Sequence, residues 1–222
     1  MAAVEDLLAA EGLGEGHVAA LALYGRLVLE ANCHFNVTGA RSPEEIVHHI
    51  TDSLSVVPYL REPYVDVGSG AGFPAIPVGI VTGMPVTLIE ATQKKARLLE
   101  SLLERLGLRG VVIPERAEAA GHRPQQRERF ATGTCRAVAS APAVAELLLP
   151  FIRIGGAAVL QRGTIDERER SALEDASLML GGSVEVEDEI GGARRIVLLR
   201  KQRATPSRFP RRTWAQKRPL CE

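Results

Sequence analysis

The fold class is indicated most clearly by one stretch of the sequence, Tyr64-Val65-Asp66-Val67-Gly68-Ser69-Gly70-Ala71-Gly72-Phe73-Pro74. Its first four residues predict a buried strand, the alternating glycines a tight loop, and the proline the first turn of a helix. Glycine has no Cβ, so the main chain of such a loop can approach a ligand closely. Ligands of parallel α/β sheets bind beyond the carboxyl ends of the strands. We therefore expect the ligand site at this loop.

Strand and helix patterns alternate through the rest of the chain. Apolar, β-favouring runs lie at 64–67, 85–90, 110–114, 134–139 and 156–161, and helical stretches at 92–106 and 143–152. This alternation predicts parallel strands joined by crossover helices. Two further runs, 184–187 and 195–200, flank Gly191-Gly192 and predict an antiparallel hairpin that closes the sheet. The expected fold is α/β and Rossmann-like, with a mostly parallel, seven-stranded sheet.

Helices precede this sheet. Residues 18–31 place apolar side chains at helical spacing, and Ser42-Pro43-Glu44-Glu45 combines an N-cap serine with a proline at the first helical position. The helix that starts there should end near Pro58. We predict an N-terminal helical extension over 1–61, a ligand-binding domain over 62–202 and a basic, proline-punctuated tail over 203–222.

The spacing of the glycines and acids discriminates between cofactors. A dinucleotide site usually has the pattern G-x-G-x-x-G, whereas this chain has D-x-G-x-G-x-G, beginning at Asp66. S-adenosylmethionine has no phosphate to place on a helix N-terminus. A second acid, Glu90, ends the second strand, where it can accept hydrogen bonds from both ribose hydroxyls. The pattern predicts S-adenosylmethionine; a nicotinamide-dependent oxidoreductase is the alternative. Asp66 either contacts this ligand or organises the loop backbone.

The charge of the chain is unevenly distributed. The formal net charge is +0, yet residues 200–222 hold eight basic residues and one acid, Glu222. A basic terminal segment on a neutral body predicts contact with a polyanion. A solvated, disordered tail is one alternative. A non-catalytic RNA-binding module that uses this tail alone is another.

Other residue types exclude several functions. Cys33, Cys135 and Cys221 lack metal or redox spacing, and Cys135 is expected to be a buried thiol. His48 and His49 have no partner at metal spacing, so we interpret them as interface or core residues, and we expect no metal site. No apolar run is long enough to span a bilayer, and we expect a cytoplasmic protein without membrane contact.

Several motifs resemble the RsmG family (glucose-inhibited division protein B), the bacterial 16S rRNA guanine-N7 methyltransferases. The resemblance begins near residue 20 and includes Asn36-Val37-Thr38-Gly39, residues 49–54, the glycine loop and Glu90-Ala91-Thr92. Arg116-Ala117-Glu118, residues 135–139 and the tail from Thr205-Pro206 through Phe209-Pro210-Arg211-Arg212 to Pro219-Leu220 extend it. It implies a class I methyltransferase fold, S-adenosylmethionine as cofactor, and 16S rRNA as substrate, within the small ribosomal subunit or an assembly intermediate.

The resemblance also implies residue roles. Gly68, Ser69, Gly70 and Phe73 would wall the methionine and ribose of the cofactor. Glu90, Ala91 and Thr92 would hold the ribose and one edge of the adenine, and Ala117 and Glu118 would flank the adenine. Arg136 would line the junction between cofactor and target, where we expect it to orient the guanine. Arg208, Arg211, Arg212 and Arg162 are expected to bind RNA phosphates.

No obvious general base accompanies these residues, and the proposed chemistry needs none. Guanine N7 carries an in-plane lone pair, so methyl transfer requires alignment rather than deprotonation. A methyltransferase acting on an exocyclic amine would be expected to have an Asn/Asp-Pro-Pro-aromatic motif after the fourth strand, where this chain has Cys-Arg-Ala-Val-Ala at 135–139. The sequence therefore predicts direct in-line transfer with no certain catalytic residue.

Overall fold

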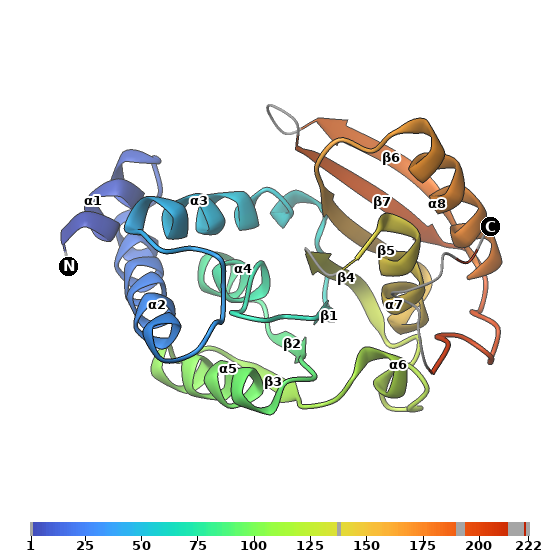
Figure 1. Cartoon of the computed structure of the whole chain (residues 1–222), viewed down its shortest axis with the longest axis horizontal. Coiled ribbons are helices and arrows are strands. Elements are labelled where there is room, and N and C mark those ends of the chain that lie inside the picture. The colour runs from blue at the N-terminus through green and yellow to red at the C-terminus, as the bar shows by residue number, and fades with distance from the viewer. Residues whose placement is uncertain (1, 137–138, 190–193, 213–219, 221–222) are drawn as a thin grey trace.

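The computed structural model describes residues 2–136, 139–189, 194–212 and 220 (Figure 1). Seven strands form one sheet in the order β3-β2-β1-β4-β5-β7-β6. Strands β1 to β5 are parallel, and β7 is antiparallel to both β5 and β6. The strands are β1 (Tyr64–Val67), β2 (Val86–Ile89), β3 (Gly110–Ile113), β4 (Phe130–Arg136), β5 (Ile152–Arg162), β6 (Gly182–Glu189) and β7 (Arg195–Lys201). The predicted sheet and its antiparallel end are confirmed.

Helices cover both faces of the sheet (Figure 1). One apolar cluster joins one face to α1 (Ala2–Ala10), α2 (Glu15–His34), α3 (Pro43–Leu54), α4 (Ala75–Thr82) and α5 (Gln93–Arg105). A second cluster joins the other face to α6 (Ala117–Ala120), α7 (Ala141–Leu148) and α8 (Glu167–Met179). Strand β7 shows the alternation behind this arrangement, since Ile196 belongs to the first cluster and Val197 to the second.

The N-terminal helices form one side of the molecule and pack against the sheet. The Ser42 hydroxyl accepts the Glu45 N–H, and Pro43 starts α3, as the sequence predicts. The helix ends at Leu54, and a short 3-10 turn (Val57–Tyr59) leads towards β1. The buried Tyr24 hydroxyl of α2 donates to the Ala71 carbonyl at 3.0 Å, which ties this extension to the glycine loop.

Several boundaries differ from those predicted: β5 begins at Ile152 rather than at 156, and α3 ends at Leu54, before Pro58. Strand β4 begins at Phe130 rather than at 134. The prediction missed its first half because Gly133 interrupts the run of β-favouring residues there. A Cβ at this position would lie 2.8 Å from Leu148 Cδ1 and 2.9 Å from Ile152 Cδ1, so a larger residue would require both side chains to shift. Helix α7 runs from Ala141 to Leu148, not over 143–152, because Pro150 permits only a 3-10 turn (Leu149–Phe151) before β5. Residues 137 and 138 lie outside the described residues.

Residues 203–212 of the predicted tail pack on the body of the protein. The Arg127 guanidinium donates to four carbonyls, those of Gly121 (2.9 Å), Thr205 (2.6 Å), Pro206 (3.2 Å) and Phe209 (2.8 Å). The Phe209 side chain is buried in the second apolar cluster. This part of the tail is therefore not a free, solvated segment. The rest of it, apart from Leu220, lies outside the described residues.

Among the described residues, no helix combines the length and the hydrophobicity that crossing a membrane requires.

Candidate functional site

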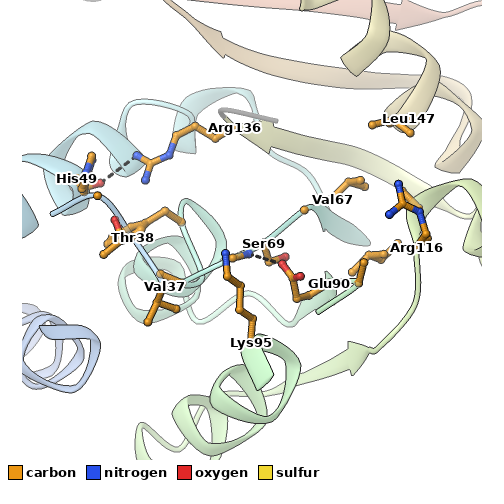
Figure 2. Close-up of a pocket in the computed structure, with 18 of the residues that line it drawn as sticks. Val37, Thr38, His49, Val67, Ser69, Glu90, Lys95, Arg116, Arg136 and Leu147 are labelled. Atoms are coloured by element: carbon orange, nitrogen blue, oxygen red, sulfur yellow. Dashed lines mark hydrogen bonds between the residues drawn. The ribbon is translucent and has the colours of Figure 1, made fainter. Parts of the chain in front are cut away.

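A cavity of about 680 Å³ lies at the carboxyl ends of β1, β2 and β4. This is a volume typical of small-molecule sites. Figure 2 shows Arg136 and His49 at one end of the cavity, Arg116 at the other, and Glu90 between them. The site is thus at the edge of the sheet where the sequence predicts it.

The glycine loop is held by backbone hydrogen bonds to β2. The N–H groups of Gly68 and Ser69 both donate to the Ile89 carbonyl, at 2.8 and 3.2 Å. Gly68 and Gly70 have φ values of 74° and 57°, in the left-handed region that favours glycine. A Cβ on Gly70 would have no atom nearer than 3.9 Å. The loop therefore borders open space that a ligand can occupy.

Glu90 connects this loop to the start of α5. Its Oε2 accepts the Gly70 N–H at 2.9 Å, and its Oε1 accepts the Thr92 N–H at 2.7 Å. The side chain is almost entirely buried but lines the cavity. A carboxylate oxygen can accept more than one hydrogen bond, so both oxygens can also receive hydroxyl groups from a ligand.

Asp66 is buried beneath the loop and does not line the cavity. Its Oδ1 accepts the Thr134 hydroxyl at 2.6 Å, and that hydroxyl bonds the Tyr64 hydroxyl at 2.6 Å. Its Oδ2 has no hydrogen-bond partner among the described residues. Burial raises the pKa of this carboxyl to about 7, against the smaller, opposite effects of the hydrogen bond from Thr134 and the charge of Arg136. The geometry therefore favours neither direct contact with a ligand nor a hydrogen bond to the loop backbone, because among the described residues the Asp66 carboxylate bonds the Thr134 side chain.

Arg136 ends β4 and lies over an aromatic ring. Its guanidinium carbon is 4.8 Å from the centroid of the Phe73 ring. The same ring packs against Tyr24 at 5.3 Å and His49 at 5.4 Å between centroids. Arg136 Nη1 also forms an ion pair with Asp52 at 3.2 Å. This arginine is therefore fixed at one end of the cavity.

The other end is formed by the segment after β3. Ala117 and Glu118 line the cavity there, and Glu118 forms an ion pair with Arg116 at 2.9 Å. The Glu118 side chain is only 6% exposed, so this is not an ordinary surface pair.

The structure brings nearly all the predicted cofactor residues to this one cavity. Thr92 is the exception, because it does not line the cavity and contributes only its N–H to Glu90. The predicted residues that line it are Gly68, Ser69, Gly70, Phe73, Glu90, Ala91, Ala117, Glu118 and Arg136.

Sequence reasoning missed a wall made by the N-terminal extension. This extension lines the cavity with Val37, Thr38, Gly39, His48, His49 and Asp52, and Lys95 of α5 lines it as well. The Asn32 side chain shapes the loop of this wall, since its Oδ1 accepts the N–H groups of Val37 and Thr38 and its Nδ2 donates to the Ala40 carbonyl. Only the resemblance of residues 36–39 and 49–54 to a family could have pointed to this wall.

Both histidines of α3 line the cavity, and neither is a core residue, because His48 is exposed and His49 is half-buried. Burial and the charge of Arg136 lower the pKa of His49. Across the described residues, no cluster of three or more His, Cys, Asp or Glu side chains could hold a metal ion.

The four arginines predicted to bind RNA fall into two pairs. Arg211 binds the buried Glu146 carboxylate at 2.7 Å, and Arg162 binds Glu169 at 2.9 Å and the Ala139 carbonyl at 2.6 Å. Arg208 and Arg212 are exposed, with Arg208 over the Phe209 ring. The first pair has partners within the protein, and the second pair faces solvent.

Comparison with known proteins identifies the family. Residues 17–197 match the model of the GidB family, described as rRNA small subunit methyltransferase G. The chain belongs to this family. It is 39% identical over 202 residues to ribosomal RNA small subunit methyltransferase G of Trichormus variabilis, covering 83% of this chain and 82% of that protein. The protein of that name from Rubrobacter xylanophilus is 41% identical over 212 residues, covering 87% and 80%.

Solved structures confirm the class I methyltransferase fold. Mitomycin 7-O-methyltransferase MmcR matches with a TM-score of 0.56 and 16% identity, covering 84% of this chain and 70% of that chain. M. jannaschii TYW2 in complex with AdoMet matches with a TM-score of 0.53 and 13% identity, covering 68% and 73%. At these identities the likeness concerns the fold alone.

Family membership confirms the predicted class of enzyme. The rRNA small subunit methyltransferase G family is S-adenosylmethionine-dependent and methylates small-subunit rRNA. The oxidoreductase and the non-catalytic RNA-binding module, the two alternatives from the sequence, do not fit this family.

The burial of Asp66 predicts a distinctive pH dependence of stability. Its pKa is about 7 in the folded protein and about 3.9 in an unfolded chain, so its contribution to stability is lost as pH rises between these values. Asp66→Asn removes this titration. We expect the free energy of unfolding of Asp66→Asn, relative to the wild type, to rise by about 2 kcal/mol from pH 5 to pH 8.

Urea unfolding of both proteins at the two pH values measures this difference. Asp175→Asn, at an exposed position of α8, is the matched control. The expectation is contradicted if the difference in the free energy of unfolding between Asp66→Asn and the wild type is the same at both pH values.

Proposed function

We propose that this protein methylates N7 of one specific guanine in 16S rRNA by direct in-line transfer. The observation that carries the proposal is the guanidinium of Arg136, held over Phe73 at one end of the cavity. Arginine pairs with the O6 and N7 edge of guanine more readily than with any other base edge. When N7 is the nucleophile, Arg136 can donate to O6 and so present N7 to the methyl group.

The cavity suits S-adenosylmethionine. Its volume, the open space at Gly70 and the nearly buried carboxylate of Glu90 match a nucleoside with an amino-acid arm. Glu90 would accept the ribose hydroxyls, Ala117 and Glu118 would flank the adenine, and Gly68, Ser69 and Phe73 would line the remaining arm. The bound cofactor supplies a methyl group on a sulfonium, which is already a good leaving group.

In this proposal the protein accelerates the reaction by aligning guanine N7 with the methyl group of the cofactor. Guanine N7 has no proton to lose, so neither His49 nor Asp52 has to act as a base. Asp52 is already in ion pairs with Arg136 and Arg194. Holding two reactants in line can contribute ~7–11 kcal/mol to the lowering of a barrier. The packing of Phe73 between Tyr24, His49 and Arg136 provides a rigid wall for this purpose.

The substrate is proposed to be 16S rRNA in the small ribosomal subunit or an assembly intermediate, in the cytoplasm. In this proposal the helical extension (1–61) completes the cavity, the domain (62–202) holds the cofactor, and the tail (203–222) meets the RNA. Arg208 and Arg212 are suited to phosphate contact because they are exposed. Arg162 and Arg211 are held by Glu169 and Glu146, so the proposal assigns the phosphate contacts first to Arg208 and Arg212.

Methyl transfer from labelled S-adenosylmethionine to bacterial small-subunit particles tests the function. We expect label at a single N7-methylguanine of 16S rRNA, which chemical cleavage at that base and primer extension will locate. Large-subunit particles are the control and should stay unlabelled. Label on another base, or on another atom of guanine, contradicts the proposed reaction.

The exposed arginines predict a salt-dependent affinity. Arg208→Gln combined with Arg212→Gln should weaken RNA binding and reduce the slope of log K against log salt by roughly 0.7 per lost contact. The slope is obtained from the affinity for 16S rRNA fragments, measured between roughly 50 and 200 mM salt. Arg105→Gln, an exposed arginine on α5, is the matched control. An unchanged slope in the double variant contradicts the assignment.

A further inference from the structure

Asp52 lies at the meeting point of two arginines that are distant in sequence. It is near the end of α3, and its side chain is 15% exposed. Its Oδ2 is 3.2 Å from Nη1 of Arg136, and its Oδ1 is 2.8 Å from Nη1 of Arg194. One carboxylate therefore joins the end of β4 to the residue that precedes β7.

The position of Asp52 is itself fixed by the sheet. Gln161 of β5 donates from Nε2 to the Asp52 backbone carbonyl at 2.7 Å and to the Ser55 hydroxyl at 3.0 Å. The end of α3 is thus attached to β5 by hydrogen bonds that involve no charged group. The backbone that carries the Asp52 carboxylate is therefore held independently of its two ion pairs.

These contacts leave part of the Arg136 guanidinium available. Within the described part of the chain, its hydrogen bonds leave from Nη1, to Asp52 and to the His49 carbonyl at 3.4 Å. The flat face lies on Phe73. A ring below and a carboxylate at one edge fix both the plane and the rotation of the group, and Nε and Nη2 remain as donors. Figure 2 shows the guanidinium beside His49 at the edge of the cavity.

We propose that Asp52 is a positioning residue for methyl transfer, which orients Arg136 towards the target guanine and keeps it there. The proposal rests on the function inferred above. Asp52 lines the cavity, but both of its oxygens hold arginines, so the role proposed for it acts through Arg136. The fork of a guanidinium recognises a planar partner only in one orientation, so a freely rotating Arg136 would bind the base less selectively.

Asp52→Asn tests this role. The amide keeps the shape of the side chain but loses the charge and one acceptor, so Arg136 is no longer fixed at one edge. We expect kcat/KM for small-subunit RNA to fall on the order of tenfold to a hundredfold, with the Kd for S-adenosylmethionine within about twofold of wild type. Asp52→Glu should recover part of the loss. Glu44→Gln, which removes an exposed acid from the same helix, is the matched control and should change neither quantity.

A double-mutant cycle separates positioning from a structural role. If Asp52 acts through Arg136, adding Asp52→Asn to Arg136→Ala causes no further loss of kcat/KM. An equal loss in both backgrounds overturns the proposal, as does a full kcat/KM in folded Asp52→Asn. If Asp52→Asn fails to fold, Arg136→Lys is the second test: lysine lacks the fork, so the same loss of kcat/KM is expected, and an unchanged value overturns the proposal. A wild-type protein that binds cofactor but does not methylate small-subunit RNA overturns the proposed function instead.

Discussion

The carboxylate of Glu90 is the constraint on which the site depends. Through its hydrogen bonds to the N–H groups of Gly70 and Thr92, it joins the glycine loop, the end of β2 and the start of α5 into one unit. Hydrogen bonds to an ionised acceptor are stronger than those between neutral groups, and here they are almost fully buried. The same two oxygens face the cavity. The group that shapes the loop is therefore the group best placed to receive a ribose.

The N-terminal helices belong to the site as much as the sheet does. The hydroxyl of Tyr24 donates a hydrogen bond to the Ala71 carbonyl in the glycine loop, and Asp52 of α3 forms an ion pair with Arg136. The loop that Asn32 shapes supplies a further wall. A boundary at residue 61 thus divides the chain by secondary structure but not by function, because the cavity needs side chains from both parts.

Local features of the sequence were enough to predict which residues meet at the end of the cavity that we assign to the cofactor. Strand β1, the glycine loop and Glu90 lie within 27 residues, and their order in a parallel sheet determines where they meet. The substrate end depends on contacts that no local pattern encodes: Asp52 pairs with residues 84 and 142 positions away. For the same reason the intramolecular partners of Arg162 and Arg211 could not be predicted. The start of β4 was placed wrongly because Gly133 is selected by tight packing rather than by strand propensity.

Calorimetric titration of S-adenosylmethionine tests the central role of Glu90 most directly. We expect Glu90→Ala to weaken binding by more than about tenfold, since two backbone donors and the ribose lose their acceptor. Glu90→Gln, which keeps one acceptor oxygen, should lie between that variant and the wild type. Glu100→Gln, at an exposed position of α5, should bind normally. Wild-type affinity in folded Glu90→Ala would contradict the account, because the loop and the cofactor would then not depend on this carboxylate.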